Sequence, residues 1–367
     1  MAYGTINADV IQSSVTGVSL GAGNATRFKN RIINGSMTIS QRGTSFTNDT
    51  TGTQYSLDRW LIYGNNASKF TVAQSSTAPT GFANSLLVTS SAATTVGASD
   101  VYEVIQRIEG FNFADLMWGT VNAKTVTLSF WVQSSLTGTF GGAFVNSANN
   151  RSYPFSYSIP VANTWTQISV TIAGDTTGTW IGSTNGIGVQ VIFGLGVGST
   201  YSGTVNTWAG TNYSAPTGAV SVVSTNAATW YITGVQLEVG SIATGFEYVD
   251  YTTQLAMCQR YYYTVKGTYG YSSVGAGIVT SSTESRIGVQ YPVQMRASPT
   301  TSISGTLYIL ISNSSGVTVT SILVNYGGEQ GAMMGMGVAS GLTAGDGSLL
   351  ITNNSGSANS FNASAEL

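Results

Sequence analysis

Apolar side chains recur at every second position in several stretches of this chain, and this period constrains the fold more than any other feature. In residues 124–135 (KTVTLSFWVQSS), the apolar positions are Val126, Leu128, Phe130 and Val132. Successive side chains of a β-strand point to opposite faces, so these four residues share one face and polar residues share the other. The stretch predicts a half-buried antiparallel strand.

The same period returns along most of the chain. Further strands are predicted at residues 101–108, 164–174, 186–198, 229–239, 285–295, 306–312, 317–326 and 347–352. Clusters of Gly, Asn, Ser and Thr separate them, as expected of turns. Many short strands with few helices predict an all-β protein built as a sandwich or jelly roll.

Two segments are predicted to be helical. Residues 112–119 offer Asn112 as N-cap and Gly119 as a stop. Residues 251–263 offer Thr252 as N-cap and form a hinge between two β domains. One face of this second helix is formed by Leu255, Cys258, Gln259 and Tyr262.

The scarcity of charge and the absence of His exclude several function classes. Charged residues make up 8% of the chain, against about 25% in an average protein. The net charge of −2 gives no basic surface for nucleic acid. Without His there is no Ser-His-Asp triad, Cys-His dyad or His-bearing zinc site. Cys258 is the only cysteine and is predicted to be a packing residue, so we expect neither metal nor cofactor.

The N-terminal segment is predicted to be an extended arm over residues 1–36. It lacks the pattern of a signal peptide, and no stretch of the chain has 18 uninterrupted apolar residues. We therefore expect synthesis in a cytoplasm and no membrane insertion. The arm is too polar to bury a core and would become ordered only against a partner; the alternative is a disordered tail. Its apolar positions are Ile6, Val10, Ile11, Val15, Val18 and Leu20.

Carboxylates are the remaining candidates for catalysis, since glycoside hydrolysis needs two of them. Asp58 stands beside Arg59, which suggests a buried structural ion pair. Asp100 and Glu103 are three residues apart on a predicted strand, so their side chains would point to opposite faces. We expect no enzyme, with a glycan hydrolase as the alternative.

Glycine-rich residues 194–198 and 331–337 do not fit a nucleotide-binding motif. They are predicted to be loops or flat strands, in which backbones approach closely. Met333, Met334 and Met336 are expected to pack in a core or between subunits rather than to form an adaptable contact surface.

Aromatic residues in polar surroundings are the candidates for ligand binding, because flat rings stack on sugar faces. These candidates are Trp131, Trp180, Tyr201, Trp208 and Tyr213. The segment 199–216, which interrupts the strand pattern, would carry the contact with a receptor together with the loops of the C-terminal domain. The alternative is that these rings pack against the sandwich or against a sister subunit.

Several segments resemble a type of bacteriophage virion protein found among tail fibres and related appendages. The matching segments are 30–43 (NRIINGSMTISQRG), 55–62 (YSLDRWLI), 126–135 (VTLSFWVQSS), 235–263 and 360–367 (SFNASAEL). The resemblance implies a jelly-roll sandwich over residues 37–250, similar to carbohydrate-binding modules, and a virion-attachment role for the arm. It also implies a homotrimer. Residues 251–367 would form the hinge helix and a second, smaller β domain.

These observations together predict a non-enzymatic structural protein of a phage particle, a short tail fibre or fibre-like appendage. It would attach to other virion proteins through its N-terminus and bind host-surface polysaccharide. The alternatives are a head fibre or capsid decoration protein and, in another class, a glycan-hydrolysing tailspike.

Overall fold

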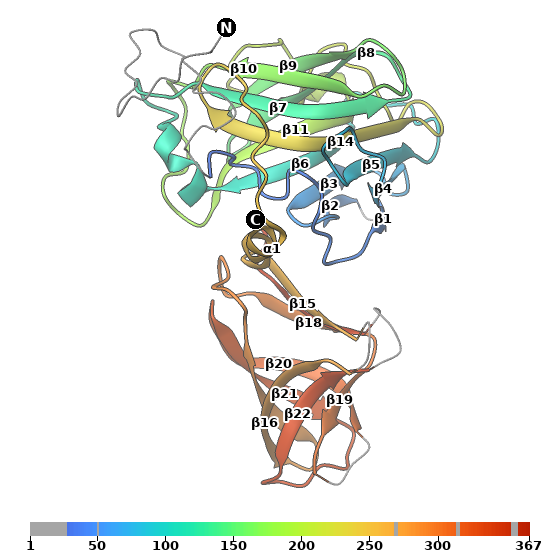
Figure 1. Ribbon diagram of the computed structural model, residues 1–367, viewed down its shortest axis with the longest axis vertical. Coiled ribbons are helices and arrows are strands. Elements are labelled where there is room, and N and C mark those ends of the chain that lie inside the picture. The colour runs from blue at the N-terminus through green and yellow to red at the C-terminus, as the bar shows by residue number, and fades with distance from the viewer. Residues whose placement is uncertain (1–27, 50, 268–270, 313–315, 354–358) are drawn as a thin grey trace, which may run out of the picture.

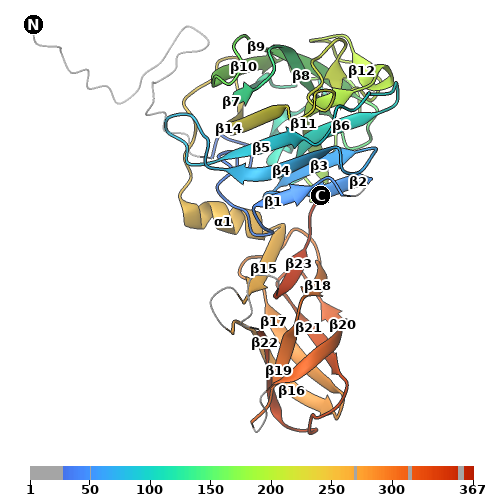
Figure 2. The same cartoon turned by 90° about the vertical axis from the view of Figure 1, so that its right-hand side faces the viewer.

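The computed structural model describes residues 28–49, 51–267, 271–312, 316–353 and 359–367. Two β units follow each other along the chain, and helix α1 (Tyr251–Gln259) lies between them (Figure 1). The N-terminal unit is the larger (Figure 2). The prediction of an all-β fold with a second, smaller β domain is confirmed.

The larger unit is a jelly-roll β-sandwich of two six-stranded antiparallel sheets. In spatial order, the first sheet contains β1 (Ser45–Thr47), β4 (Phe70–Ser75), β5 (Ser85–Ser90), β14 (Thr229–Val239), β7 (Val126–Ser134) and β10 (Thr166–Ile172). The second sheet contains β2 (Gly52–Tyr55), β3 (Trp60–Gly64), β6 (Val101–Glu109), β11 (Ile187–Val197), β8 (Gly138–Val145) and β9 (Ser152–Ile159). A short parallel pair, β12 (Ser202–Gly203) and β13 (Ala215–Pro216), lies beside the second sheet.

The core of the sandwich is filled by alternate residues of the facing strands. In β7, Val126, Leu128, Phe130 and Val132 are each at most 1% exposed, so the predicted inward face is confirmed. The Phe130 ring meets Phe193 of β11 edge-on at 5.2 Å between centroids, which joins the two sheets.

The smaller unit is a closed six-stranded barrel with a three-stranded sheet between it and α1. The barrel order is β16 (Ser273–Ser281), β17 (Glu284–Gln290), β21 (Gly331–Val338), β20 (Val317–Gly327), β19 (Leu307–Leu310) and β22 (Gly347–Thr352). The small sheet contains β15 (Tyr262–Lys266), β23 (Ser360–Ser364) and β18 (Thr300–Ser304). Both glycine-rich segments lie in strands or at their ends. Met334 and Met336 fill the barrel core, whereas Met333 is 43% exposed.

The helix predicted at residues 112–119 is wrong. The chain instead forms two short 3-10 turns, η1 (Gly110–Asn112) and η2 (Ala114–Leu116), so Asn112 ends a turn and caps no helix. Met117 adopts a left-handed conformation with φ 56°, which ends the second turn before an α-helix can form.

Helix α1 is real but shorter than predicted. Its N-cap is Asp250 and not Thr252, because the Asp250 carboxylate accepts a hydrogen bond from the Thr253 N–H at 3.0 Å. The helix ends at Gln259, because from Tyr262 onward the chain pairs with β23 as strand β15.

Buried and half-buried charged groups join the two units, and they form what we call the junction cluster: Arg42, Arg59, Glu109, Arg260 and Glu366. Glu366, which follows the last strand of the smaller unit, accepts from Arg42 at 3.1 Å and also from Arg59. Arg260, just after α1, donates to both oxygens of Glu109 at 2.6 and 3.0 Å. Charged hydrogen bonds of this kind hold the barrel unit against the sandwich.

The predicted ion pair between Asp58 and Arg59 is wrong, although both side chains are buried. Asp58 accepts from the main-chain and side-chain nitrogens of Gln41, both at 2.6 Å. Arg59 turns instead to Glu366 and to the Arg107 carbonyl. The backbone of Arg59 has a positive φ of 69°, in the left-handed region.

The six apolar arm positions Ile6, Val10, Ile11, Val15, Val18 and Leu20 lie outside the described residues. Residues 28–36 of the predicted arm do not stand apart from the sandwich. Ile32 is 3% exposed in the sandwich core, and the Arg31 N–H donates to the Leu237 carbonyl at 2.9 Å. The Ile33 N–H donates to the Gln106 side chain at 2.8 Å, so this part of the chain is an integral element of the sandwich.

Cys258 packs against Ile33, Ile39 and Tyr261 and is fully buried, as predicted. Burial raises the pKa of its thiol well above the usual range. In the described ranges no three His, Cys, Asp or Glu residues are placed to hold a metal ion. Within the same ranges, no helix has the length and apolar character needed to cross a membrane.

Candidate functional site

The outer face of the second sheet carries a hollow. Strands β6 and β11 pair near the centre of this sheet, and alternate residues of both point away from the sandwich core. Ile105 of β6 and Ile192 of β11 belong to an apolar cluster that is separate from that core. The loop at 146–151 and the segment 199–216 supply further lining residues, so the hollow has an apolar floor and polar walls.

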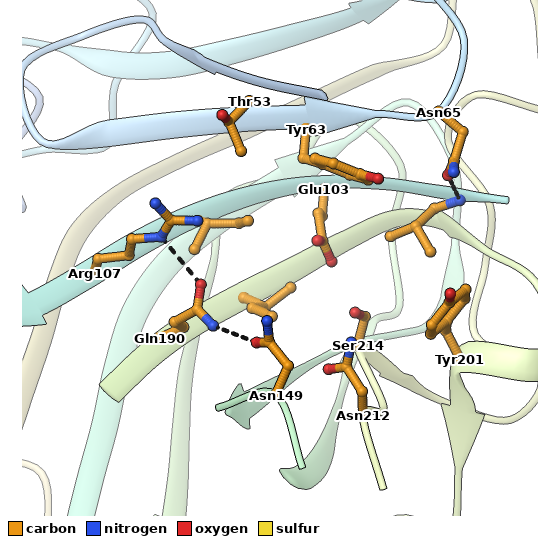
Figure 3. Close-up of a pocket in the computed structure, with 13 residues that line it drawn as sticks. Thr53, Tyr63, Asn65, Glu103, Arg107, Asn149, Gln190, Tyr201, Asn212 and Ser214 are labelled. Atoms are coloured by element: carbon orange, nitrogen blue, oxygen red, sulfur yellow. Dashed lines mark hydrogen bonds between the residues drawn. The ribbon is translucent and has the colours of Figure 1, made fainter. Parts of the chain in front are cut away.

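The hollow has a volume of about 210 Å³, and its lining is polar, with Glu103 and Arg107 as its charged residues (Figure 3). Its lining residues are Thr53, Tyr63, Asn65, Val101, Glu103, Ile105, Arg107, Asn149, Gln190, Ile192, Tyr201, Asn212 and Ser214. Amides and hydroxyls of this kind both donate and accept hydrogen bonds. Pockets for drug-sized ligands measure roughly 300–1,000 Å³, so this one suits a smaller group such as a single sugar ring.

Glu103 is the carboxylic acid of the lining. The residue is 7% exposed, and its Oε2 makes no hydrogen bond with the described residues. Burial raises the pKa of Glu103 to about 7, while a hydrogen bond from Ser214 and the charge of Arg107 act in the opposite direction. The carboxyl group therefore changes its charge near neutral pH.

Two half-buried tyrosines accompany this carboxyl group in the hollow. Tyr63 comes from β3, and Tyr201 comes from the 3-10 turn η3 (Ser199–Tyr201). Burial raises the pKa of the Tyr63 phenol, and the neighbouring Glu103 and Tyr201 add to the effect. Tyr63 is the direct cross-strand neighbour of Glu103, and Tyr201 lines the same hollow.

A chain of hydrogen bonds fixes the other end of the hollow. The Arg107 Nε donates to Gln190 at 3.1 Å, and the Gln190 Nε2 donates to Asn149 at 2.8 Å (Figure 3). Another nitrogen of Arg107 donates to the main-chain oxygen of Leu367, and so does the Tyr55 hydroxyl. The end of the barrel unit thus helps to set the position of a lining residue.

Of the five aromatic candidates, Tyr201 alone is a lining residue. Trp180 and Trp208 meet edge-on at 5.6 Å and pack against the sandwich core around Trp118. The Trp180 N–H donates to Asp175 at 3.0 Å. Trp180 and Trp208 therefore pack against the sandwich, which was the alternative to ligand binding.

The other two candidates lie away from the lining as well. Trp131 is half-buried on the outer face of the first sheet, on the opposite side of the sandwich from the hollow. Tyr213 is half-buried, and its ring lies against Gly203. The segment 199–216 nevertheless contributes Asn212 and Ser214 to the hollow.

The residue pattern of β6 could have revealed more of the site. Glu103, Ile105 and Arg107 are two residues apart and therefore share one face of the strand. Three charged residues, Glu103, Arg107 and Glu109, in a largely apolar strand, VYEVIQRIE, indicate a special environment. Asp100 does not share a strand with Glu103 as predicted: it precedes β6, and its carboxylate accepts a hydrogen bond from the Gly97 N–H at 2.9 Å.

A second hollow, of about 610 Å³, lies on the barrel. It is lined mainly by glycine and apolar residues, and Gln290 is its one side chain with an amide. Tyr326 and Met333 at its border are 72% and 43% exposed. This surface lacks the array of polar groups that orients a small polar ligand.

Neither the family models nor the curated proteins that were searched contain a match to this chain. Solved structures resemble it at low identity. The enzymatically active domain of tailspike protein 4 of bacteriophage CBA120 is 14% identical over 58% of this chain, with a TM-score of 0.33, and the match spans 22% of that protein.

Two sugar-binding proteins are among the other matches. A putative sugar-binding protein of Bacteroides thetaiotaomicron is 14% identical, with 57% of this chain and 100% of that chain covered and a TM-score of 0.35. The family 11 carbohydrate-binding module of a Clostridium thermocellum cellulase is 12% identical, with 53% and 99% covered and a TM-score of 0.27.

Proposed function

We propose that this chain is a non-enzymatic structural protein of a bacteriophage particle that binds host-surface glycan in the hollow of its second sheet. The placement in a short tail fibre or fibre-like appendage is supported by the resemblance of residues 30–43, 55–62 and 235–263 to such proteins. Attachment to the particle is assigned to the N-terminal segment, and the localisation is the virion.

The observation that carries the binding proposal is the lining of the hollow. Asn65, Asn149 and Asn212 converge there with the two tyrosines. Amides and phenols match the alternating donors and acceptors of sugar hydroxyls, and aromatic rings contribute contact area at small entropic cost. The apolar floor excludes water beneath a bound ring.

The single carboxyl group of the lining supports a binding role rather than hydrolysis. Glycosidases use two carboxylic acids, about 5–5.5 Å or 6.5–9.5 Å apart. Glu103 has no second acid among the lining residues of the hollow. We expect the purified protein to release no reducing ends from host polysaccharide; release would favour a tailspike enzyme instead.

An array of bacterial surface polysaccharides, probed with the purified full chain, tests the binding proposal. Replacing Tyr63 and Tyr201 together by Ala should weaken binding at least tenfold. The matched control is Trp131→Ala, which removes a half-buried ring on the opposite face and should change binding less than twofold. The reverse result would place the binding surface on the first sheet.

The proposal includes a homotrimer. Leu323, Val324 and Tyr326 on β20 and Met333 on β21 are 67%, 40%, 72% and 43% exposed, which is unusual for large apolar side chains. Burying them between copies would remove this surface from water with few charges to desolvate. Light scattering should give three times the 38.1 kDa chain mass; a stable monomer would contradict the proposal.

Electron microscopy of intact particles tests the location. Density for the sandwich and barrel on the tail would support the fibre assignment. The same density on the head would favour a head fibre or decoration protein.

A further inference from the structure

Glu103 is a buried carboxyl group that forms no salt bridge among the described residues. Arg107 lies four residues further along β6, so the Cα atoms of the two residues are about 13 Å apart at the rise of a strand, and the charge of Arg107 only partly offsets the effect of burial on the pKa of Glu103. Its Nε is bound to Gln190, and another of its nitrogens is bound to Leu367. A ligand that brings a positive charge to Glu103 would therefore compensate a group that the protein leaves unpaired.

The surroundings of this carboxyl group favour a cation. Tyr63 of β3 stands directly opposite Glu103 of β6 in the register of the sheet, and Tyr201 lines the same hollow. The faces of aromatic rings attract ammonium groups by about 0.5–2 kcal/mol, depending on how fully the site excludes water. An ammonium group also has three donors, and Glu103 Oε2 is an acceptor without a partner.

We propose that the hollow selects a sugar with a free primary amine, a hexosamine, and that its ammonium group contacts Glu103 next to Tyr63 and Tyr201. This inference rests on the proposed glycan-binding function and specifies the ligand class. An N-acetylated amine has no charge and only one donor, so it gains less from the carboxylate. An acidic sugar would bring a second carboxylate beside Glu103 and is disfavoured.

The amide lining suits the remaining part of such a ligand. Asn212 and Asn149 can hydrogen-bond to ring hydroxyls. The volume of about 210 Å³ accommodates one sugar ring, so the amine belongs to a terminal or protruding residue of the glycan.

The test compares glucosamine and galactosamine with glucose, galactose and N-acetylglucosamine, by saturation-transfer NMR titration of the full chain at pH 7. The two amines should bind at least tenfold more tightly than the other sugars. Glu103→Gln, which keeps the shape of the side chain, should remove this preference and change the affinity for glucose less than twofold. Asp100→Asn is the matched control, because it removes a carboxylate that precedes β6 and does not line the hollow, so the preference for the amines should remain.

A second measurement does not depend on any variant. Ammonium binding requires ionised Glu103, and the other charged or titratable groups of the lining are Arg107, Tyr63 and Tyr201. Because the pKa of Glu103 is about 7, the ionised fraction rises about fivefold between pH 6 and pH 7. The affinity for glucosamine should rise by the same factor, while the affinity for glucose stays constant.

The outcomes separate this inference from the proposed function. If neutral and amino sugars bind equally tightly, or if Glu103→Gln weakens both alike, the amine inference is refuted and glycan binding stands. If no amino sugar binds but a host polysaccharide does, the inference fails in the same way. If neither the simple sugars nor any surface polysaccharide binds, the proposed function itself fails.

Discussion

Glu103→Gln should make the sandwich more stable, and more so at high pH. The wild-type carboxyl group is buried among β6, β11 and the segment 199–216, where burial disfavours the charged form. A neutral amide of the same shape avoids this cost and can still accept a hydrogen bond from Ser214. The substitution removes a charge and leaves the packing unchanged.

The magnitude follows from the pKa of Glu103. It rises from 4.5 to about 7 on folding, and each pKa unit corresponds to about 1.4 kcal/mol, so the ionised group destabilises the fold by about 3 kcal/mol. Between pH 4.5 and 7 the folded protein binds more protons at this site than the unfolded chain does. This contribution to stability therefore falls as pH rises through that window and is constant above it.

The assay is urea unfolding of the wild type and Glu103→Gln at pH 4.5 and pH 8.5, followed by tryptophan fluorescence, since the tryptophans lie in the sandwich segment of the chain. The variant should exceed the wild type in free energy of unfolding by about 3 kcal/mol at pH 8.5 and by a small amount at pH 4.5. Taking the difference at each pH cancels the titration of all other groups. An equal difference at both pH values would refute the reasoning.

Three further substitutions test other parts of the structure. Trp208→Ala should lower the free energy of unfolding by about 2–3 kcal/mol, measured by urea titration, because it opens the aromatic cluster; unchanged stability with lost glycan binding would make that ring a ligand contact instead. Glu366→Gln should lower the free energy of unfolding by about 3–5 kcal/mol in a thermal-unfolding series, because it leaves the buried guanidinium of Arg59 without a countercharge. Asp115→Asn, at an exposed ion pair, should lower it by less than about 1 kcal/mol. Gly142→Ala should reduce the yield of folded protein, because its Cβ would collide with the Ile192 carbonyl oxygen. Gly182→Ala is the control: its Cβ would enter open space, so the circular dichroism spectrum should not change.

The strands could be predicted because a half-buried strand alternates apolar and polar residues along its own sequence. β14 has the predicted bounds, Thr229–Val239, and β7 has the predicted inward face. Helix ends were less predictable, because several adjacent residues can serve as N-cap and the backbone geometry of the folded chain decides which one does. Asp250 and Thr252 are both good N-caps, and the structure uses the carboxylate.

The sequence by itself determined the all-β class, the burial of Cys258 and the lack of His chemistry, because these depend on composition and on local period. The tertiary structure decided which polar groups meet. Tyr63, Glu103 and Tyr201 come from three separate elements, and they become neighbours only when β3 and β6 pair and the segment 199–216 folds beside them. The same holds for Arg59, whose partner Glu366 stands 307 residues further along the chain. No local pattern can specify such a contact, since its energy depends on burial that the whole fold creates.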